Sequence, residues 1–259
     1  MKLFKAIRVL ILLFILAFVA FYSKSQKLKS QSWVEPLPVI IYPMNIDHSL
    51  TSRDYIQHLS DKDFTEIELF FKRESKKYSL TVAQPITITL GSVLTEFPPE
   101  TPMSFSNPLT VIWWGLSFRY WAWLHTPDSV SNHHRVRIFV YYHRIDDEQV
   151  LAHSLGLDKG LLAIVHAFAD KRQQAQNNII IAHELLHTVG ATDKYGARNQ
   201  PLFPHGYANP DKRPLYPQKK AEIMTARIPL SMTKAVMARN LNQCVINSET
   251  AKEINWLRN

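Results

Sequence analysis

Short apolar runs alternate with longer amphipathic segments along most of the chain. Runs rich in Val, Ile and aromatic residues predict β-strands at Pro38–Tyr42, Pro85–Leu90, Arg135–His143 and Leu161–Phe168. Apolar residues at helical spacing predict helices at Asp61–Tyr78, Asn177–Gly190 and Ser248–Leu257. Strands interleaved with helices predict a layered fold of the α/β or α+β class. No internal repeat or low-complexity stretch follows Trp33, so residues 33–259 are expected to form one domain.

The segment Leu109–Leu124, LTVIWWGLSFRYWAWL, has more than one interpretation. As a second membrane span it would place Arg119 two-thirds of the way along an apolar helix, where a charge is costly. As a helix of the folded domain it would pack its tryptophans into the core and turn Arg119 towards water, and this is the interpretation we favour. A helix lying on a membrane surface stays open as a third interpretation.

The first 32 residues predict a membrane anchor followed by a linker. Val9–Tyr22 contains no charge, and basic residues stand on both sides of it. This pattern is typical of a transmembrane helix, although it reaches a full span only if Ala6–Arg8 are included. A cleaved signal peptide is the alternative, but the small residues are poorly placed for cleavage. Ser23–Ser32 is polar and basic, as in a linker. We therefore expect a single-pass membrane protein with residues 33–259 outside the cytoplasm, in a bacterial envelope.

Composition narrows the class of protein. Hydrophobic residues make up 46% of the 259 residues and charged residues 20%, which excludes a disordered chain and a multi-span membrane protein. The single cysteine, Cys244, excludes an internal disulfide and a cysteine-based zinc ribbon. The formal net charge is +8, but three of these charges, on Lys2, Lys5 and Arg8, precede the apolar N-terminal run. The net charge of the rest of the chain, about +5, is ordinary. Nothing in the sequence resembles a nucleic-acid-binding module, so no nucleic-acid partner is expected.

The segment Asn178–Asp193, NIIIAHELLHTVGATD, carries the candidate chemistry. His183 and His187 are four residues apart, so a helix presents both imidazoles on one face, where they can reach one metal ion. Glu184 follows the first histidine and is expected beside the ion, where a carboxylate can deprotonate a bound water. Gly190 is able to end the helix in a left-handed turn, which would bring the Asp193 carboxylate back towards the histidines.

These residues resemble a known family. His183–Asp193 is similar to the extended zinc motif of the metzincin metallopeptidases, in the variant where aspartate replaces the third histidine. Ala221–Thr225 resembles the methionine-containing turn that lies under the metal in that clan, with Met224 as its methionine. The sequence departs from the family at Ala226, where a tyrosine often stands. The resemblance implies a zincin-like α+β fold, with a mixed sheet, an active-site helix and one catalytic Zn²⁺.

Two carboxylates are candidates for the third metal ligand. Asp193 is favoured, because the turn at Gly190 explains how it returns to the site. Glu222 is the alternative, because other zinc peptidases draw a glutamate ligand from a second helix at a comparable distance from His187. Glu222 lies between a proline-rich loop and Met224 rather than clearly on a helix.

These features together predict a membrane-anchored zinc metallopeptidase acting on a peptide or protein substrate. Zn²⁺ would be held by His183, His187 and Asp193, and Glu184 would act as the general base towards water. Leu161–Phe168 is the expected edge strand for pairing with an extended substrate. Two alternatives stay open: a metal-binding protein that hydrolyses nothing, and a membrane-tethered interaction protein with structural histidines.

Overall fold

The computed structural model describes residues 28–102, 107–126, 135–145, 154–157 and 161–257, together with a few residues before residue 28. Its main sheet has the strand order β2-β1-β3-β5-β4. The first four strands in this order run parallel, and β4 lies antiparallel to β5 at the edge. The strands are β1 Leu37–Asn45, β2 Ile86–Leu90, β3 Val136–His143, β4 Leu155–Leu157 and β5 Leu162–Phe168.

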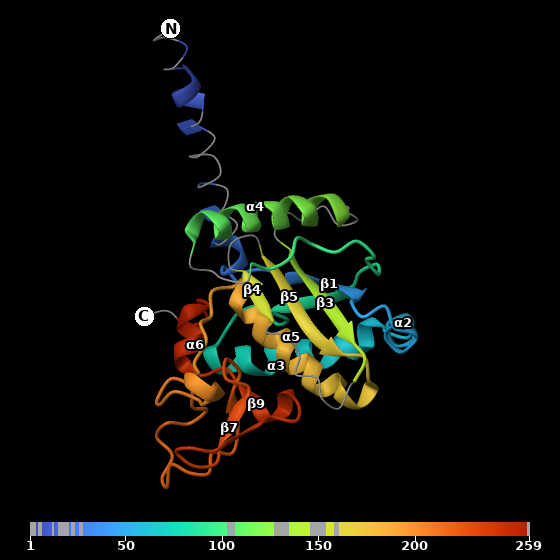
Figure 1. Ribbon diagram of the computed structural model, residues 1–259. Coiled ribbons are helices and arrows are strands. Elements are labelled where there is room, and N and C mark those ends of the chain that lie inside the picture. The colour runs from blue at the N-terminus through green and yellow to red at the C-terminus, as the bar shows by residue number, and fades with distance from the viewer. Residues whose placement is uncertain are drawn as a thin grey trace.

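Helices cover both faces of the main sheet (Figure 1). One face carries α4 Pro108–His125, and the other carries α2 Leu50–Gln57, α3 Thr65–Ser75 and α5 Gln174–Thr188. The side chains of β1 alternate between these layers: Val39 and Ile41 pack on the side of α3 and α5, whereas Ile40 and Tyr42 pack on the side of α4. Burial on both faces explains why the strands appear in the sequence as nearly continuous apolar runs.

A second, smaller sheet follows α5 in the chain and has the strand order β8-β7-β6-β9. We call residues 196–245, which contain this sheet, the C-terminal lobe. In Figure 1 β7 and β9 lie beyond α3 and α5, on the side away from α4. The elements are β6 Ala221–Glu222, β7 Arg227–Pro229, β8 Ala235–Met237, β9 Cys244–Val245 and, after the lobe, α6 Ser248–Glu253.

The predicted elements are present with shifted ends, but the predicted α+β class is wrong. Helices separate β1, β2 and β3 in the chain, and four of the five strands run parallel, which defines an α/β protein. Parallel neighbours require long crossovers, and α2 with α3 crosses from β1 to β2, while α4 crosses from β2 to β3. The apolar runs located the strands without showing their direction. β5 lies between β3 and β4, so the prediction that Leu161–Phe168 forms the edge strand is also wrong.

The structure does not support the predicted transmembrane helix. Among the described residues, no helix combines the length and the apolar character needed to cross a bilayer. The prediction of a single-pass anchor over Val9–Tyr22, and of a membrane location based on it, is therefore wrong for this part of the chain. Several residues of that run lie outside the described residues.

The apolar segment Leu109–Leu124 forms α4, which packs on the sheet. Trp114, Phe118 and Trp121 are buried against it, so the helix belongs to the folded domain as predicted. Among the described residues, however, only one side of α4 is packed against the rest of the protein. The other side exposes large apolar side chains: Leu109, Ile112, Trp113, Leu116, Tyr120, Trp123 and Leu124. The tryptophans are thus divided between the core and the surface.

Candidate metal centre

The helix α5 carries the histidine pair, and its first half is fixed to the main sheet. It starts at Gln174, so Asn177 and Asn178 lie inside the helix, and both are buried. The Asn177 amide pairs with the backbone of Phe168 at the end of β5: Nδ2 donates to the carbonyl oxygen at 2.9 Å, and Oδ1 accepts from the amide at 3.2 Å. These two hydrogen bonds set the position of α5 along the sheet.

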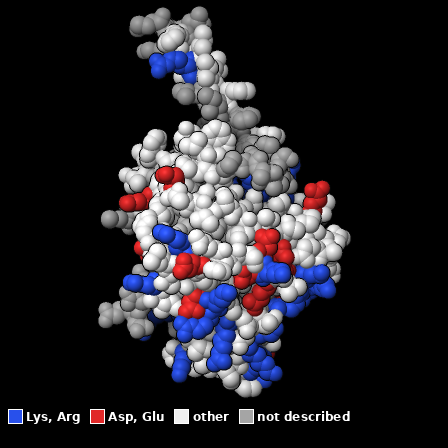
Figure 2. Space-filling model, turned by 90° about the vertical axis from the view of Figure 1, so that its right-hand side faces the viewer, with Lys and Arg blue, Asp and Glu red and all other residues white. Residues whose placement is uncertain are grey.

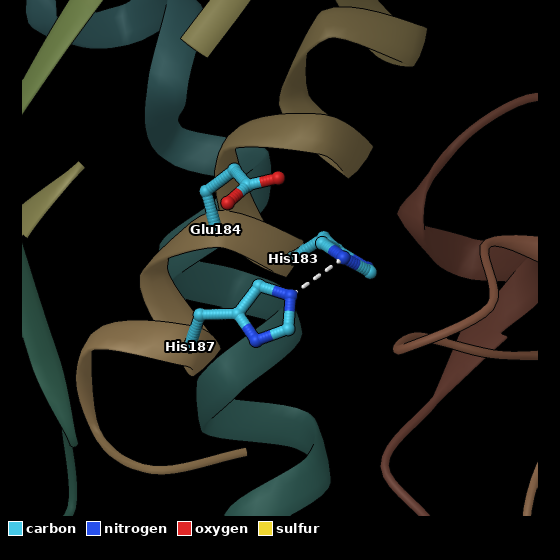
Figure 3. Close-up of side chains that lie close together, drawn as sticks. All are labelled: His183, Glu184 and His187. Atoms are coloured by element: carbon cyan, nitrogen blue, oxygen red, sulfur yellow. Dashed lines mark hydrogen bonds between the residues drawn. The ribbon is translucent and has the colours of Figure 1, made fainter. Parts of the chain in front are cut away.

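His183, Glu184 and His187 form a cluster on α5 that could hold a metal ion (Figure 3). One helical turn separates the two imidazoles, and their Nε2 atoms are 3.0 Å apart. His183 is 8% exposed and Glu184 5% exposed, so these two side chains lie largely out of contact with solvent. The cluster is compatible with a zinc site.

Backbone carbonyl groups accept hydrogen bonds from the Nδ1 atoms of both imidazoles. His183 Nδ1 lies 3.0 Å from the carbonyl oxygen of Ile223, and His187 Nδ1 lies 2.8 Å from that of Ala191. A carbonyl oxygen only accepts hydrogen bonds, so both Nδ1 atoms carry a proton and donate it. In the neutral rings the lone pairs therefore lie on the Nε2 atoms, the tautomer that a metal requires.

The chain reverses after α5 and brings Asp193 to the same point. Gly190 has a φ of 102°, the left-handed conformation that its position predicted. Asp193 Oδ1 then lies 3.2 Å from Nε2 of His183 and 3.2 Å from Nε2 of His187. Burial works to raise the pKa of Asp193, but hydrogen bonds and positive charge from the two histidines outweigh it and hold the pKa well below its usual range.

Three lone-pair-bearing atoms thus converge within 3.0–3.2 Å of one another. Two imidazole lone pairs and a carboxylate repel at this distance unless a cation or a proton lies between them. Burial lowers the pKa of His183, but the hydrogen bond to Asp193 and the charge of Glu184 outweigh this effect and raise it overall. The site therefore attracts positive charge at the point where the three atoms meet.

The Glu184 carboxylate lies beside the point where the atoms of His183, His187 and Asp193 meet, and one of its oxygens has no hydrogen-bond partner among the described residues. Its Oε2 is buried and accepts no hydrogen bond from any described residue. Burial raises the pKa of Glu184, although the charges of His183 and His187 and a hydrogen bond from the Gly156 backbone to the carboxylate oppose the shift. A buried carboxylate oxygen without a partner is costly, and such atoms are typical of places where water or a ligand binds.

The edge strand β4 passes directly over α5 at Gly156. A Cβ atom at this position would lie 2.5 Å from His187 Cβ and 2.7 Å from the Glu184 carbonyl oxygen. Only glycine permits such an approach between the strand and the cluster. Sequence reasoning missed this residue, because β4 has three residues and shows no recognisable pattern.

The other predicted site residues, Glu222 and Met224, lie at the end of β6 and in the turn that follows it. Met224 is fully buried, and the neighbouring Ile223 supplies the carbonyl group that holds His183. Glu222, the alternative third ligand, is also fully buried, and both of its oxygens are occupied. Oε1 accepts from Thr250 Oγ1 at 2.8 Å, and Oε2 accepts from the Met224 amide at 2.5 Å. Glu222 therefore holds the turn, whereas Asp193 contacts the histidine pair.

Tyr195 is a further group near the cluster. Its ring lies 6.4 Å from the His183 ring, centroid to centroid, and nearly parallel to it. Burial and the negative charge of Asp193 raise the pKa of Tyr195 to about 12, so its hydroxyl group remains protonated at neutral pH.

A second pair of histidines lies elsewhere in the main sheet. His143 Nε2 and His166 Nδ1, on β3 and β5, are 2.9 Å apart. Burial and the neighbouring His143 lower the pKa of His166 to about 4. In the part of the chain that the structure describes, no carboxylate or cysteine completes this pair as a metal site. His133, His134 and His153 lie outside the described residues.

No protein-family model and no curated protein matches this sequence.

Proposed function

We propose that the protein is a zinc-dependent metallopeptidase that hydrolyses peptide bonds. The observation that carries the proposal is the convergence of His183 Nε2, His187 Nε2 and Asp193 Oδ1, with the unpartnered Glu184 Oε2 beside them. Two imidazoles, one carboxylate and an open position form the ligand set of catalytic zinc sites. The similarity of His183–Asp193 and of the Met224 turn to metzincins supports the same proposal.

The distances fit Zn²⁺. Tetrahedral zinc binds nitrogen and oxygen at about 2.0–2.2 Å, which places its ligand atoms about 3.3–3.5 Å apart. The three separations among His183, His187 and Asp193 are 3.0, 3.2 and 3.2 Å, so small rotations of the side chains suffice to accept the ion. The carbonyl groups that hold both Nδ1 atoms orient the imidazoles for it.

The chemistry follows from the position of each group. When bound, the ion supplies Lewis-acid character, which polarises a peptide carbonyl group and lowers the pKa of water towards about 7. Glu184 takes a proton from the attacking water at Oε2 and passes it to the departing amine. Burial raises the pKa of Glu184, so this carboxyl group is better able to hold the proton between the two steps.

The substrate is a polypeptide in extended conformation. β4 is the edge strand of the main sheet next to α5, and it passes over the cluster at Gly156. A peptide that pairs with the outer edge of β4, where no other described strand lies, gains backbone hydrogen bonds independent of its sequence. Its scissile bond would then lie against the metal centre, because β4 contacts the helix that carries both histidines.

The decisive experiment compares the full-length protein with two variants. Glu184→Gln is expected to bind one zinc ion per chain and to lose peptide hydrolysis by at least about 100-fold, because the general base is absent. His187→Ala is expected to lose both zinc and hydrolysis. Metal analysis and a peptidase assay with and without chelator measure these outcomes.

Other results would contradict the proposal. Zinc binding without hydrolysis by the unaltered protein would indicate a non-hydrolytic metal protein. Absence of stoichiometric zinc would leave His183 and His187 as structural residues. Hydrolysis by Glu184→Gln at the unaltered rate would exclude Glu184 as the base.

A further inference from the structure

Positive charge is concentrated in the C-terminal lobe. Residues 196–245 contain eight lysines and arginines against two acidic residues, so this fifth of the chain carries +6 of the formal net charge of +8. Figure 2 shows Lys and Arg gathered at the lower end of the molecule, where the lobe lies in Figure 1. The eight cations are Arg198, Lys212, Arg213, Lys219, Lys220, Arg227, Lys234 and Arg239.

These charges are not neutralised within the lobe. Of its two acidic residues, Glu222 is fully buried and hydrogen-bonded to Thr250, which leaves Asp211 as the exposed carboxylate. None of the eight cations forms an ion pair with another described residue. A concentration of unpaired charge of one sign attracts partners of the opposite sign.

Three of the lysines line one groove. Lys212, Lys219 and Lys220 surround a groove of about 350 Å³, together with Asn209 and Gln218. Gln218 is buried and fixes the groove: its Oε1 accepts from the Asn209 amide at 3.0 Å, and its Nε2 donates to the Asn209 carbonyl oxygen at 2.9 Å. The backbone that presents the lysines is therefore held in place before any partner binds.

The groove lies close to the metal centre along the chain. Lys219 and Lys220 directly precede β6, and Ile223, whose carbonyl group holds His183, follows it. Three residues of chain span at most about 11 Å, so Lys220 lies within that distance of Ile223. An extended peptide of a few residues covers the distance between the metal centre and the groove, because each residue adds about 3.3 Å.

We propose that this groove binds acidic side chains of a polypeptide, and that the substrates of the metal centre carry such residues a few positions from the cleaved bond. The second half of the proposal rests on the proposed peptidase function, whereas binding in the groove does not. Lysine ammonium groups, with three donors each on flexible stems, suit carboxylates that arrive in varied geometry. Exposed contacts of this kind are individually weak and sensitive to salt, so several lysines must act together.

Binding is measured separately from hydrolysis. The probe is a fluorescein-labelled decapeptide of alternating glutamate and alanine, with glutamine and lysine versions as references. Full-length Glu184→Gln protein is titrated with each peptide, and anisotropy gives the dissociation constants. We expect the glutamate peptide to bind about tenfold tighter than the glutamine peptide at about 20 mM salt, and this preference to disappear at about 0.5 M salt.

Charge substitutions then locate the site. Replacing Lys212, Lys219 and Lys220 with glutamine is expected to remove the preference for glutamate. A matched control replaces Lys62, Lys76 and Lys171, three exposed lysines outside the lobe, and is expected to retain it. Single Lys219→Gln, at an exposed position, gives a smaller loss in the same direction and guards against misfolding of the triple variant.

Three outcomes overturn the proposal. One is equal affinity for the glutamate and glutamine peptides. A second is an equal loss of preference in the control variant, which would show a response to net charge alone. The third is binding of a single-stranded oligonucleotide of equal charge through the groove lysines more tightly than the peptide. Hydrolysis of neutral peptides by the unaltered protein, without any acidic preference, would overturn the substrate assignment and leave the peptidase function intact.

Discussion

Gly156 shows how closely a single residue constrains the candidate metal centre. An added Cβ would lie 2.5 Å from His187 Cβ, and both the strand and the helix are held by the sheet. Gly156→Ala is therefore expected to cost about 1–3 kcal/mol of stability through overpacking. Displacement of the imidazole is expected to weaken zinc binding about 10–100-fold. Chemical denaturation and a competition titration with a chromophoric chelator measure the two effects.

Gly115 in α4 provides the matched control for this substitution. A Cβ there would lie 3.4 Å from the flexible guanidinium of Arg119, so Gly115→Ala meets little obstruction. Alanine in a helix is favoured over glycine by about 0.5–1 kcal/mol, and a small gain in stability is expected. Unchanged zinc affinity in Gly156→Ala would show that β4 does not limit the position of His187.

Glu222 gives the stability a specific dependence on pH. Burial raises the pKa of its carboxyl group from 4.5 to about 7, against the opposing hydrogen bond from Thr250. The folded state thus keeps a proton that the unfolded chain releases at about pH 4.5. This contribution to stability is complete below pH 4.5 and is lost as the pH rises to 7.

Glu222→Gln tests this dependence in metal-free protein. Glutamine resembles the protonated carboxyl group, so the variant should gain stability relative to the unaltered protein between pH 5 and pH 8, by at most about 3 kcal/mol. Denaturant midpoints at the two pH values measure the difference. Glu249→Gln, at a partly exposed helical position paired with Lys252, is the control and should shift stability by less than about 0.5 kcal/mol. A parallel response of both variants would contradict the assignment to Glu222.

Side chains of the site were predictable from the sequence where local geometry determines them. The spacing of His183 and His187 fixes their relation on a helix, and Gly190 adopts the left-handed conformation that brings Asp193 back. The carbonyl groups of Ile223 and Ala191 were not predictable, because every residue has a carbonyl group and only the tertiary fold selects these two.

At the scale of elements, α4 has apolar side chains both on the face that packs against the sheet and on its exposed face. Phe118 is fully buried against the sheet, whereas Trp123 is 66% exposed. Phe118→Ala is expected to cost about 3–5 kcal/mol by leaving a cavity. Trp123→Ala is expected to change stability by less than about 0.5 kcal/mol, because it removes little buried area. Denaturation curves of both variants provide the comparison, and similar losses would show that the outer face of α4 is covered in solution.

The type of an element was predictable where burial imposes a regular pattern of apolar residues. The position of an element was not predictable where it depends on which strands pair. The run Leu161–Phe168 was correctly assigned to a strand, but its position within the sheet depends on β4, a strand of three residues. The composition of α4 indicated a buried helix, yet it could not show which face meets the sheet, because both faces are apolar. The place of a strand within its sheet and the buried face of a helix both depend on contacts with residues that are distant in the sequence.

At the scale of the whole molecule, the candidate metal centre lies where the two parts of the fold meet. α5 packs under the main sheet and supplies His183, and the turn after β6 in the C-terminal lobe holds the same imidazole through Ile223. The α/β class is also a property of the whole molecule, because the direction of each strand depends on the connection that precedes it. A ligand bound by α5 and by the chain that leads into the lobe should stabilise both parts together.

Zinc is therefore expected to stabilise the entire fold. At about 100 times its dissociation constant, a ligand that binds only the folded state adds about 2.7 kcal/mol, which corresponds to a rise in Tm of about 5–10 °C for a protein of this size. Chelator should lower Tm by this amount and speed proteolysis within residues 196–220, because the imidazole that holds Ile223 is then no longer fixed by the ion. Thermal denaturation and limited proteolysis, each with added zinc or chelator, measure both effects. His187→Ala should show neither response. A zinc-dependent rise in Tm in that variant would place the stabilising ion elsewhere in the molecule.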